Sequence, residues 1–222
     1  MKISVVKMGL VEYGEALEIQ MRLVAQRREG LIGDTFLLLE HPPVITVGAG
    51  GKRENILATD EELAAAGVTV FDISRGGDVT YHGPGQIVGY PIFDLNGFGR
   101  DIHEFVRKIE ETFIQMLGRE FGIAAGRKEK FTGVWVGDEK ITAIGIAVRH
   151  WITMHGFAFN VNTRLEHFNW IVPCGIVGKG VTSLEKLLGR KQDMDAVAGL
   201  TVKYFCEAFG IDFEYAGKEK YA

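Results

Sequence analysis

The segment R-G-G-D-V-T-Y-H-G-P-G-Q, residues 75–86, holds four glycines and a proline among twelve residues. Glycine serves where φ must be positive or where a ligand comes close to the main chain. A glycine-rich β-turn with a satisfied histidine is one interpretation. Arg75, Tyr81, His82 and Gln86 add hydrogen-bonding side chains around this bare backbone. We therefore expect a binding loop.

A second segment, P-C-G at residues 173–175, places one thiol between two residues that shape the backbone. A free cysteine is usually a small buried hydrophobe. A nucleophilic cysteine needs a nearby cation or N–H donors that favour the thiolate. The residues alone leave both roles open for Cys174, whereas Cys206, near Val202 and Phe205, is expected in the core.

Composition bounds the class of protein. The chain has 222 residues, 46% of them hydrophobic and 24% charged, which favours a single soluble domain over residues 1–222. A net charge of −4 argues against nucleic-acid binding. No apolar run approaches the ~20 residues of a membrane span, and Lys7 and Glu12 interrupt any signal-like stretch. Because the chain has only two cysteines, a reducing cytoplasm is expected. The lack of a long apolar run predicts no membrane association.

Periodicity and capping signals predict a mixture of helices and strands without a βαβ rhythm. In the first helix we expect Leu17, Met21, Val24 and Ala25 on the buried face. The expected helices are 14–29, 59–67, 101–121, 182–188 and 193–209; the expected strands are 3–10, 35–39, 44–47, 68–73, 87–95, 133–136, 140–148 and 153–161. The predicted fold class is α+β, a mixed and mainly antiparallel sheet with flanking helices.

Other motifs carry weaker signals. Residues 47–53, V-G-A-G-G-K-R, fail the P-loop spacing because Lys52 precedes Arg53 instead of Ser or Thr, so an ordinary turn is expected. The six histidines show no metal-ligand spacing, so no metal site is predicted. Judged from its sequence neighbours only, Lys140 is expected to be a solvated lysine of a hairpin. His155 interrupts an apolar alternation and is expected to be a hydrogen-bonded structural histidine.

Taken together, the segments resemble the lipoyl(octanoyl) transferases. The matching stretches are E-H-P-P-V-I-T-V-G (40–48), R-G-G-D-V-T-Y-H-G-P-G-Q (75–86), G-Y-P-I-F-D-L (89–95), K-I-T-A-I-G (140–145), H-G-F-A-F-N-V (155–161) and P-C-G-I-V-G-K-G-V-T-S-L (173–184). They occur in family order and span about two-thirds of the chain. The resemblance implies the fold of lipoate- and biotin-protein ligases.

The resemblance also implies an activity: octanoyl transfer from octanoyl-acyl carrier protein to a lysine of lipoyl domains, in 2-oxoacid dehydrogenase E2 subunits and glycine cleavage H protein, without a cofactor. It implies Cys174 as the acyl-thioester nucleophile and Lys140 as its paired lysine. The implied acyl-site residues are Arg75, Gly76, Gly77, Asp78, Val79, Thr80, Tyr81, His82, Ala143, Ile144, Gly145, Gly156, Phe157 and Ala158.

Three questions stay open at this point. Either neutral Lys140 or His82 could take the proton of the acceptor lysine. An ATP-dependent lipoate-protein ligase is a rival that the P-C-G segment disfavours, because adenylate chemistry needs no cysteine. A non-catalytic module that binds acyl carrier or lipoyl domains is a second rival, disfavoured by the presence of both Lys140 and Cys174.

Overall fold

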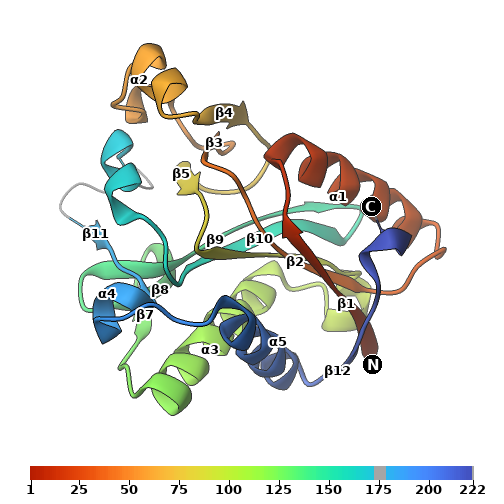
Figure 1. Cartoon of the computed structure of the whole chain (residues 1–222). Coiled ribbons are helices and arrows are strands. Elements are labelled where there is room, and N and C mark those ends of the chain that lie inside the picture. Colours follow the sequence, from red (N-terminus) through yellow and green to blue (C-terminus); the bar gives the residue numbers. More distant parts are fainter. Residues whose placement is uncertain (173–178, 222) are drawn as a thin grey trace.

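A large mixed sheet forms the body of the protein (Figure 1). The computed structural model describes residues 1–172 and 179–221. In the described residues the main sheet has nine strands, ordered β12 (Asp212–Tyr215), β1 (Lys2–Leu10), β2 (Thr35–Glu40), β6 (Gln86–Ile92), β10 (Ile152–Asn160), β9 (Glu139–Arg149), β8 (Phe131–Val136) and β7 (Gly126–Lys128), with β11 (Gly180–Val181) beside β9. The pairs β12–β1, β1–β2 and β11–β9 are parallel and the others antiparallel. The predicted α+β class with a mixed, mainly antiparallel sheet is confirmed.

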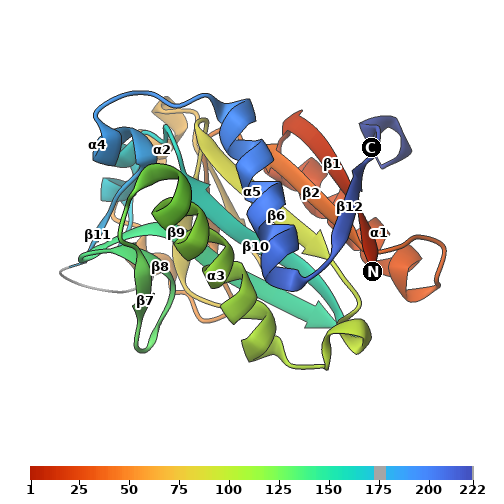
Figure 2. The same cartoon turned by 90° about the horizontal axis from the view of Figure 1, so that it is seen from below.

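Two long helices, α3 (Ile102–Phe121) and α5 (Met194–Phe209), lie side by side across one face of this sheet (Figure 2). Asp101 caps α3 by accepting a hydrogen bond from the backbone N–H of Glu104, and Gly122 ends it with φ of 64°. Its apolar residues Phe105, Ile109 and Phe113 are fully buried, as expected for the inner stripe of this helix. Aromatic rings join helices to sheet: the centroids of Phe36 and Phe205 are 4.4 Å apart.

The opposite face is covered by α1 (Tyr13–Arg28), which packs on β6 and β10. The predicted buried face of this helix is confirmed for Val24 and wrong for the rest, since Met21 and Ala25 are exposed and Leu17 is half-buried. The buried side chains are Tyr13, Ala16, Ile19, Gln20, Leu23 and Val24. Gln20 is responsible for the error, because a polar residue in the buried stripe hides the true periodicity.

A second, three-stranded sheet has the order β4 (Thr69–Asp72), β3 (Val44–Val47), β5 (Val79–His82). The short helix α2 (Asp60–Ala65) precedes it, and Thr59 and Glu62 form the predicted capping box. The strand expected at 68–73 is confirmed as β4, but it is shorter, and it is partly exposed at the edge of the sheet where a buried strand was expected. Strand β5, which lies inside the glycine-rich segment, is not among the expected strands.

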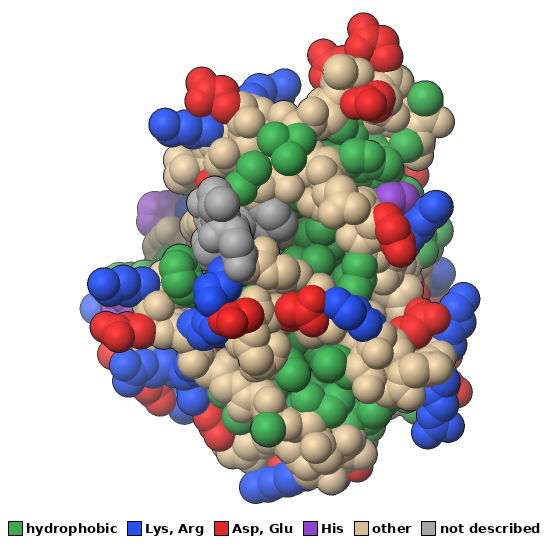
Figure 3. Space-filling view, turned by 90° about the vertical axis from the view of Figure 1, so that its left-hand side faces the viewer, with side chains coloured by type: hydrophobic (Ala, Val, Ile, Leu, Met, Phe, Trp, Pro, Cys, Tyr) green, Lys and Arg blue, Asp and Glu red, His purple; other side chains and the backbone are tan. Residues whose placement is uncertain are grey.

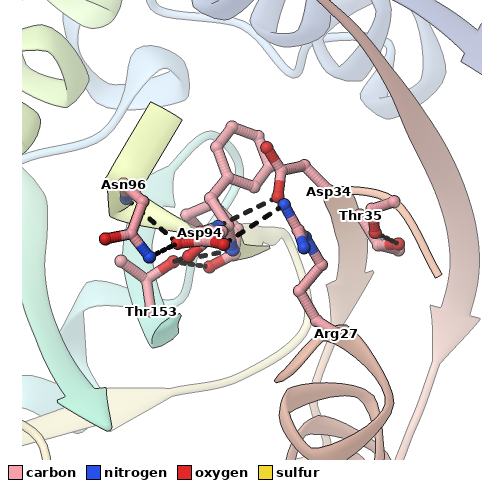
Figure 4. Close-up of polar contacts among 9 residues, drawn as sticks. Arg27, Asp34, Thr35, Asp94, Asn96 and Thr153 are labelled. Carbon is pink, nitrogen blue, oxygen red and sulfur yellow. Dashed lines mark hydrogen bonds and ion pairs between the residues drawn. The ribbon is translucent and has the colours of Figure 1, made fainter. Parts of the chain in front are cut away.

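A polar group around the buried Asp34, the Asp34 cluster (Arg27, Asp34 and Asp94), ties α1 to the sheet (Figure 4). Asp34 Oδ1 accepts hydrogen bonds from Arg27 Nε at 2.7 Å and from the backbone N–H of Asp94 at 2.9 Å. Arg27 Nη2 also lies 3.6 Å from the Asp94 carboxylate. Nearby, the Thr153 hydroxyl donates to the Pro91 carbonyl at 2.6 Å. Polar atoms at this end of the sheet are thus paired with each other.

The remaining helix, α4 (Leu184–Leu188), is capped by Ser183. None of the helices in residues 1–172 and 179–221 is long and apolar enough to span a membrane.

Candidate active site

A cavity of about 430 Å³ lies where the small sheet faces β9 and β10 of the main sheet. Its size is in the usual range for small-molecule pockets. It is lined by Tyr13, Gly50, Arg75, Gly77, Asp78, Thr80, His82, Tyr90, Lys130, Phe131, Thr132, Lys140, Ala143, Ile144, Gly145, His155, Gly156, Phe157 and Ala158. Small apolar residues of β9 and β10 line one side of the cavity, here called the floor, and the glycine-rich segment with its polar side chains lines the other side, here called the roof.

Small residues from two paired strands form the floor. Ala143 on β9 lies opposite Ala158 on β10, and Gly145 lies opposite Gly156. A Cβ at Gly156 would come within 2.1 Å of the Gly89 carbonyl oxygen, so only glycine allows β6 and β10 to approach this closely. The floor is therefore flat and apolar, suited to a hydrocarbon chain.

Arg75 fastens the glycine-rich segment to both sheets. Its Nη2 donates to the Thr46 carbonyl at 2.9 Å, and its Nη1 donates to the Gly76 carbonyl at 3.0 Å. The next residue docks on the main sheet, because the Gly76 N–H donates to the Ile146 carbonyl at 3.0 Å. The guanidinium thus holds the roof in place as well as lining the cavity.

The turn at residues 48–51 packs against the same segment. The N–H of Gly48 donates to the Asp78 carbonyl at 3.1 Å, and that of Gly50 to the Gly77 carbonyl at 3.2 Å. The Asp78 carboxylate in turn accepts from Asn55 Nδ2 at 2.7 Å. The stretch predicted as an ordinary turn is therefore a turn that forms part of the cavity wall.

Lys140 lies at one end of the cavity. Its side chain is buried, 8% exposed, and its Nζ lies 4.9 Å from the ring centroid of Trp135. The interpretation of a solvated hairpin lysine, drawn from the residue alone, is wrong. At this distance the face of the indole ring attracts a cation electrostatically. The side chain leans over Gly133, where a Cβ atom would lie 3.4 Å from Lys140 Cδ and Cε.

The proposed nucleophile, Cys174, lies outside the described residues. The chain on either side is fastened near the cavity: the Val172 N–H donates to the Asn55 carbonyl at 2.7 Å, and the Thr182 N–H donates to the Lys140 carbonyl at 3.0 Å. Lys179 forms an ion pair with Asp138 in the turn before β9. Figure 3 shows this face, where acidic and basic side chains alternate around a central apolar area.

His82 projects from β5 with a defined tautomer. Gln86 Nε2 donates to the Tyr81 carbonyl at 3.2 Å and to Asn160 Oδ1 at 2.9 Å, so Gln86 Oε1 must accept from His82 Nδ1 at 2.8 Å. His82 Nε2 therefore carries the lone pair. Burial, followed by the neighbouring His41, lowers the pKa of His82 to about 3. This imidazole is neutral at pH 7.

Tyr90 and His41 form a second neutral pair. His41 Nδ1 donates to the Val11 carbonyl at 2.7 Å, so its Nε2 accepts from the Tyr90 hydroxyl, also at 2.7 Å. Burial lowers the pKa of His41 to about 4 and raises the pKa of Tyr90 well above its usual value. The Tyr90 oxygen thus presents acceptor lone pairs to the cavity.

The structure overturns the expectation for His155. Neither ring nitrogen has a hydrogen-bond partner in the described part of the chain, although the side chain is only 2% exposed. Its backbone takes the left-handed conformation, with φ of 58°, and its N–H donates to Gln20 Oε1 at 2.7 Å. Burial, followed by the charge of Arg75, lowers the pKa of His155 to about 4. A buried, unpartnered imidazole in an unusual backbone conformation points to function.

Most of the predicted acyl-site residues come together at the cavity. Gly76, Val79 and Tyr81 do not line it; Val79 and Tyr81 alternate with Thr80 and His82 along β5 and pack in a separate core, where the Tyr81 hydroxyl meets His167 Nδ1 at 2.7 Å. Sequence reasoning missed Tyr13, Tyr90 and His155 as lining residues of the cavity, together with Gly50, Lys130, Phe131 and Thr132. Only His155 left a signal, its break in an apolar alternation.

In the described residues no group of three or more His, Cys, Asp or Glu side chains is arranged to hold a metal ion. The buried histidines beside the cavity are related by ring contacts instead, with 5.8 Å between the centroids of His41 and His82.

Comparisons with known proteins agree with this geometry. Residues 12–206 match the family model of the lipoyl protein ligase A/B catalytic domain. An octanoyltransferase of Caldicellulosiruptor saccharolyticus is 60% identical over 220 residues, which cover 99% of this chain and 94% of that protein. A crystal structure of lipoate-protein ligase A bound with ATP has a TM-score of 0.78 at 16% identity, covering 98% of this chain and 89% of that one. Biotin protein ligase from Aquifex aeolicus has a TM-score of 0.53 at 13% identity, covering 95% and 69%.

The chain belongs to the lipoyl protein ligase A/B catalytic-domain family. Within that family its high identity is to proteins named octanoyltransferase, so the predicted resemblance and the prediction of an acyltransferase are confirmed. The predicted fold, shared with lipoate- and biotin-protein ligases, is confirmed as well.

Proposed function

We propose that this enzyme transfers an octanoyl group from octanoyl-acyl carrier protein to a lysine of a lipoyl domain, through a thioester on Cys174. The observation that carries the proposal is the buried Lys140 at the end of an apolar-floored cavity. Thr182 is anchored on Lys140 itself and Val172 on Asn55, whose side chain bonds the cavity-lining Asp78, and this supports the choice of Cys174. The name and 60% identity of the relative support the octanoyl group.

In the first half-reaction the Cys174 thiolate attacks the carbonyl carbon of the carrier thioester. The Lys140 ammonium favours this thiolate, lowering the thiol pKa from its reference of ~8.5. The new C–S bond to Cys174 forms as the C–S bond to the carrier breaks. The departing carrier thiolate takes a proton from Lys140, which becomes a neutral amine.

In the second half-reaction the neutral amine of the acceptor lysine attacks octanoyl-Cys174. The amide C–N bond forms, the C–S bond breaks, and the thiolate of Cys174 returns. The nitrogen of the acceptor passes its surplus proton to neutral Lys140, which restores the starting ion pair. His82 is the poorer base, because its pKa of about 3 gives it little affinity for a proton. The structure thus favours Lys140 where the residues alone left a choice.

The acceptors we propose are the lipoyl domains of 2-oxoacid dehydrogenase E2 subunits and the H protein of glycine cleavage, in the cytoplasm. A thioester is already activated toward an amine, so no ATP enters the balance. This separates the proposal from the lipoate-protein ligase that shares the fold, whose structure holds ATP.

Intact mass spectrometry tests the intermediate. Incubation with octanoyl-acyl carrier protein, without acceptor, should add one octanoyl group to the wild type. Cys206→Ala should keep the adduct, because burial raises the pKa of the Cys206 thiol to about 12 and leaves it unreactive. Cys174→Ala should lose adduct and turnover together. An active Cys174→Ala enzyme would exclude the thioester mechanism.

A second assay addresses the ligase alternative. Transfer from the carrier should proceed equally with and without ATP and magnesium, and free octanoate plus ATP should give no product. A strict requirement for ATP would assign the chain to the ligases instead.

A further inference from the structure

The cavity has two distinct ends along β9. The Lys140 side chain lies over Gly133 of the neighbouring strand. A Cβ at Gly133 would lie 2.5 Å from the Thr142 carbonyl oxygen, so the head group of Lys140 lies near the level of Ala143 on β9. His155 lies opposite Ile146, three residues further along β9. At about 3.4 Å per residue the two levels are roughly 10 Å apart.

An octanoyl chain fits this span. Its seven carbon–carbon bonds, each about 1.5 Å, cover roughly 9 Å when extended. A carbonyl carbon held near Lys140 would place the chain over Ala143 and Ala158, then over Gly145 and Gly156. Its terminal methyl would arrive at the ring of His155.

His155 contacts two other elements, helix α1 and strand β6. Its N–H is fixed by Gln20 Oε1 at 2.7 Å, and its ring meets the Tyr90 ring edge-on with centroids 6.5 Å apart. The left-handed backbone directs the side chain out of the regular alternation of β10. Such a conformation is unfavourable for a residue with a Cβ, and backbone strain of this kind beside a cavity supports a functional role.

We propose that His155 closes the far end of the acyl site and limits the transferred chain to about eight carbons. This inference rests on the proposed function and adds a specificity-determining residue to it. Two further methylenes would overlap the imidazole ring. His155 is 2% exposed, and both of its ring nitrogens are buried, so the ring is packed among protein atoms at the cavity wall. Being neutral, the imidazole adds no charge against the apolar tip of a chain that does fit.

Removing the ring should lengthen the site. His155→Gly keeps the left-handed backbone accessible and opens the end wall toward Tyr90. We would measure kcat/KM with octanoyl-, decanoyl- and dodecanoyl-acyl carrier protein and a lipoyl domain as acceptor. Each methylene newly buried is worth a factor of about four, so the two extra methylenes of decanoyl should raise the decanoyl-to-octanoyl ratio about fifteenfold over the wild type.

His150→Gly is the matched control. His150 also has a positive φ, 50°, but it is exposed in the turn after β9 and lies away from the cavity. It should keep the chain-length preference of the wild type. His155→Asn serves as the second test variant, since asparagine tolerates the left-handed region and is shorter than histidine. It should shift the ratio in the same direction by a smaller factor.

The outcomes separate this inference from the function beneath it. A wild type that transfers no octanoyl group overturns the proposed function. If the wild type transfers octanoyl and both His155→Gly and His155→Asn fold but keep the chain-length ratio of the wild type, the proposed role of His155 is wrong while the proposed function stands. If His155→Gly does not fold, His155→Asn decides. A shift of equal size in His150→Gly would also overturn the end wall, because it would trace the effect to backbone freedom.

Discussion

Two buried polar groups lie along helix α1 and differ in one respect. In the Asp34 cluster, Arg27 and the Asp94 backbone both donate to one carboxylate. Two turns earlier on α1, Gln20 holds His155, and three of their side-chain nitrogens have no partner in the described residues. The Asp34 cluster, where α1 joins the sheet, has its carboxylate hydrogen-bonded, whereas Gln20 and His155, beside the cavity, keep buried nitrogens without hydrogen-bond partners in the described residues. The difference suggests that the first group serves stability and the second serves function.

The largest expected effect breaks function while sparing the fold. Lys140→Met keeps most of the side-chain bulk and removes the charge. Turnover should fall by about a thousandfold or more, since both thiolate formation and proton transfer are lost. Alkylation of Cys174 should slow near neutral pH, and its midpoint should move upward; one unit of pKa corresponds to ~1.4 kcal/mol between charged forms.

Lys140→Arg distinguishes the two roles of the lysine. Arginine retains a cation beside the thiol but does not give up a proton, so acylation of Cys174 should persist in part while transfer to the acceptor fails. The pH profile of alkylation for wild type and both variants is the measurement. A Met variant that titrates like the wild type would remove Lys140 from thiol activation.

The second expected effect is a loss of stability without a loss of turnover. Asp34→Ala leaves Arg27 Nε and the Asp94 N–H without their acceptor, although Arg27 Nη2 keeps the Asp94 carboxylate at 3.6 Å, so the free energy of unfolding should fall by about 3 kcal/mol. Asp34→Asn keeps an acceptor oxygen and should cost less. Urea unfolding measures both, and turnover per folded molecule at low temperature should match the wild type. A fall in turnover without a fall in stability would contradict the division between the two groups.

The third effect is a pH dependence. Because the pKa values of His41, His82 and His155 lie at about 4, 3 and 4, these residues stay neutral when folded but take up protons near pH 6.5 when unfolded. Their contribution to stability is therefore present above pH 6.5 and is lost as the pH falls toward 4. Each histidine adds a slope of up to about 1.4 kcal/mol per pH unit in that window.

His155→Asn sharpens this prediction, because it removes one of the three titrating groups. Its stability between pH 4 and 6.5 should fall less steeply than that of the wild type, as measured by urea unfolding at several pH values. Parallel curves would show that His155 is not held neutral by burial.

Local signals explain what the sequence could predict of this fold. Asp101 and Gly122 bound α3 through interactions within a few residues, and the capping box at Thr59 is equally local. Strand β12 was missed because all four of its residues are exposed, and only pairing with β1 makes it a strand. Tertiary packing, not local pattern, decided these cases.

The same distinction holds for the site. The glycine-rich segment and the floor residues were accessible from the sequence through a family resemblance. Tyr90 looked like an ordinary core aromatic, and its hydroxyl acquires meaning only from His41, 49 residues earlier in the chain. Likewise, nothing in the sequence indicates that the nitrogens of His155 would be enclosed without partners, since that depends on α1 and β10 meeting.

The smallest expected effect tests the unpaired group directly. Gln20→Met removes the acceptor for the His155 N–H, and an unsatisfied buried N–H costs about 1–3 kcal/mol. The same change removes Gln20 Nε2, a buried donor that has no partner in the described chain, and so relieves a cost of similar kind. The two contributions oppose each other, so the net loss of stability should be about 1 kcal/mol or less, well below that of Asp34→Ala.

Released from Gln20, His155 should also close the cavity less firmly, and decanoyl transfer should rise slightly. Urea unfolding of the two variants side by side is the measurement. A loss as large for Gln20→Met as for Asp34→Ala would mean that both groups hold the fold equally, and the contrast between them would fail.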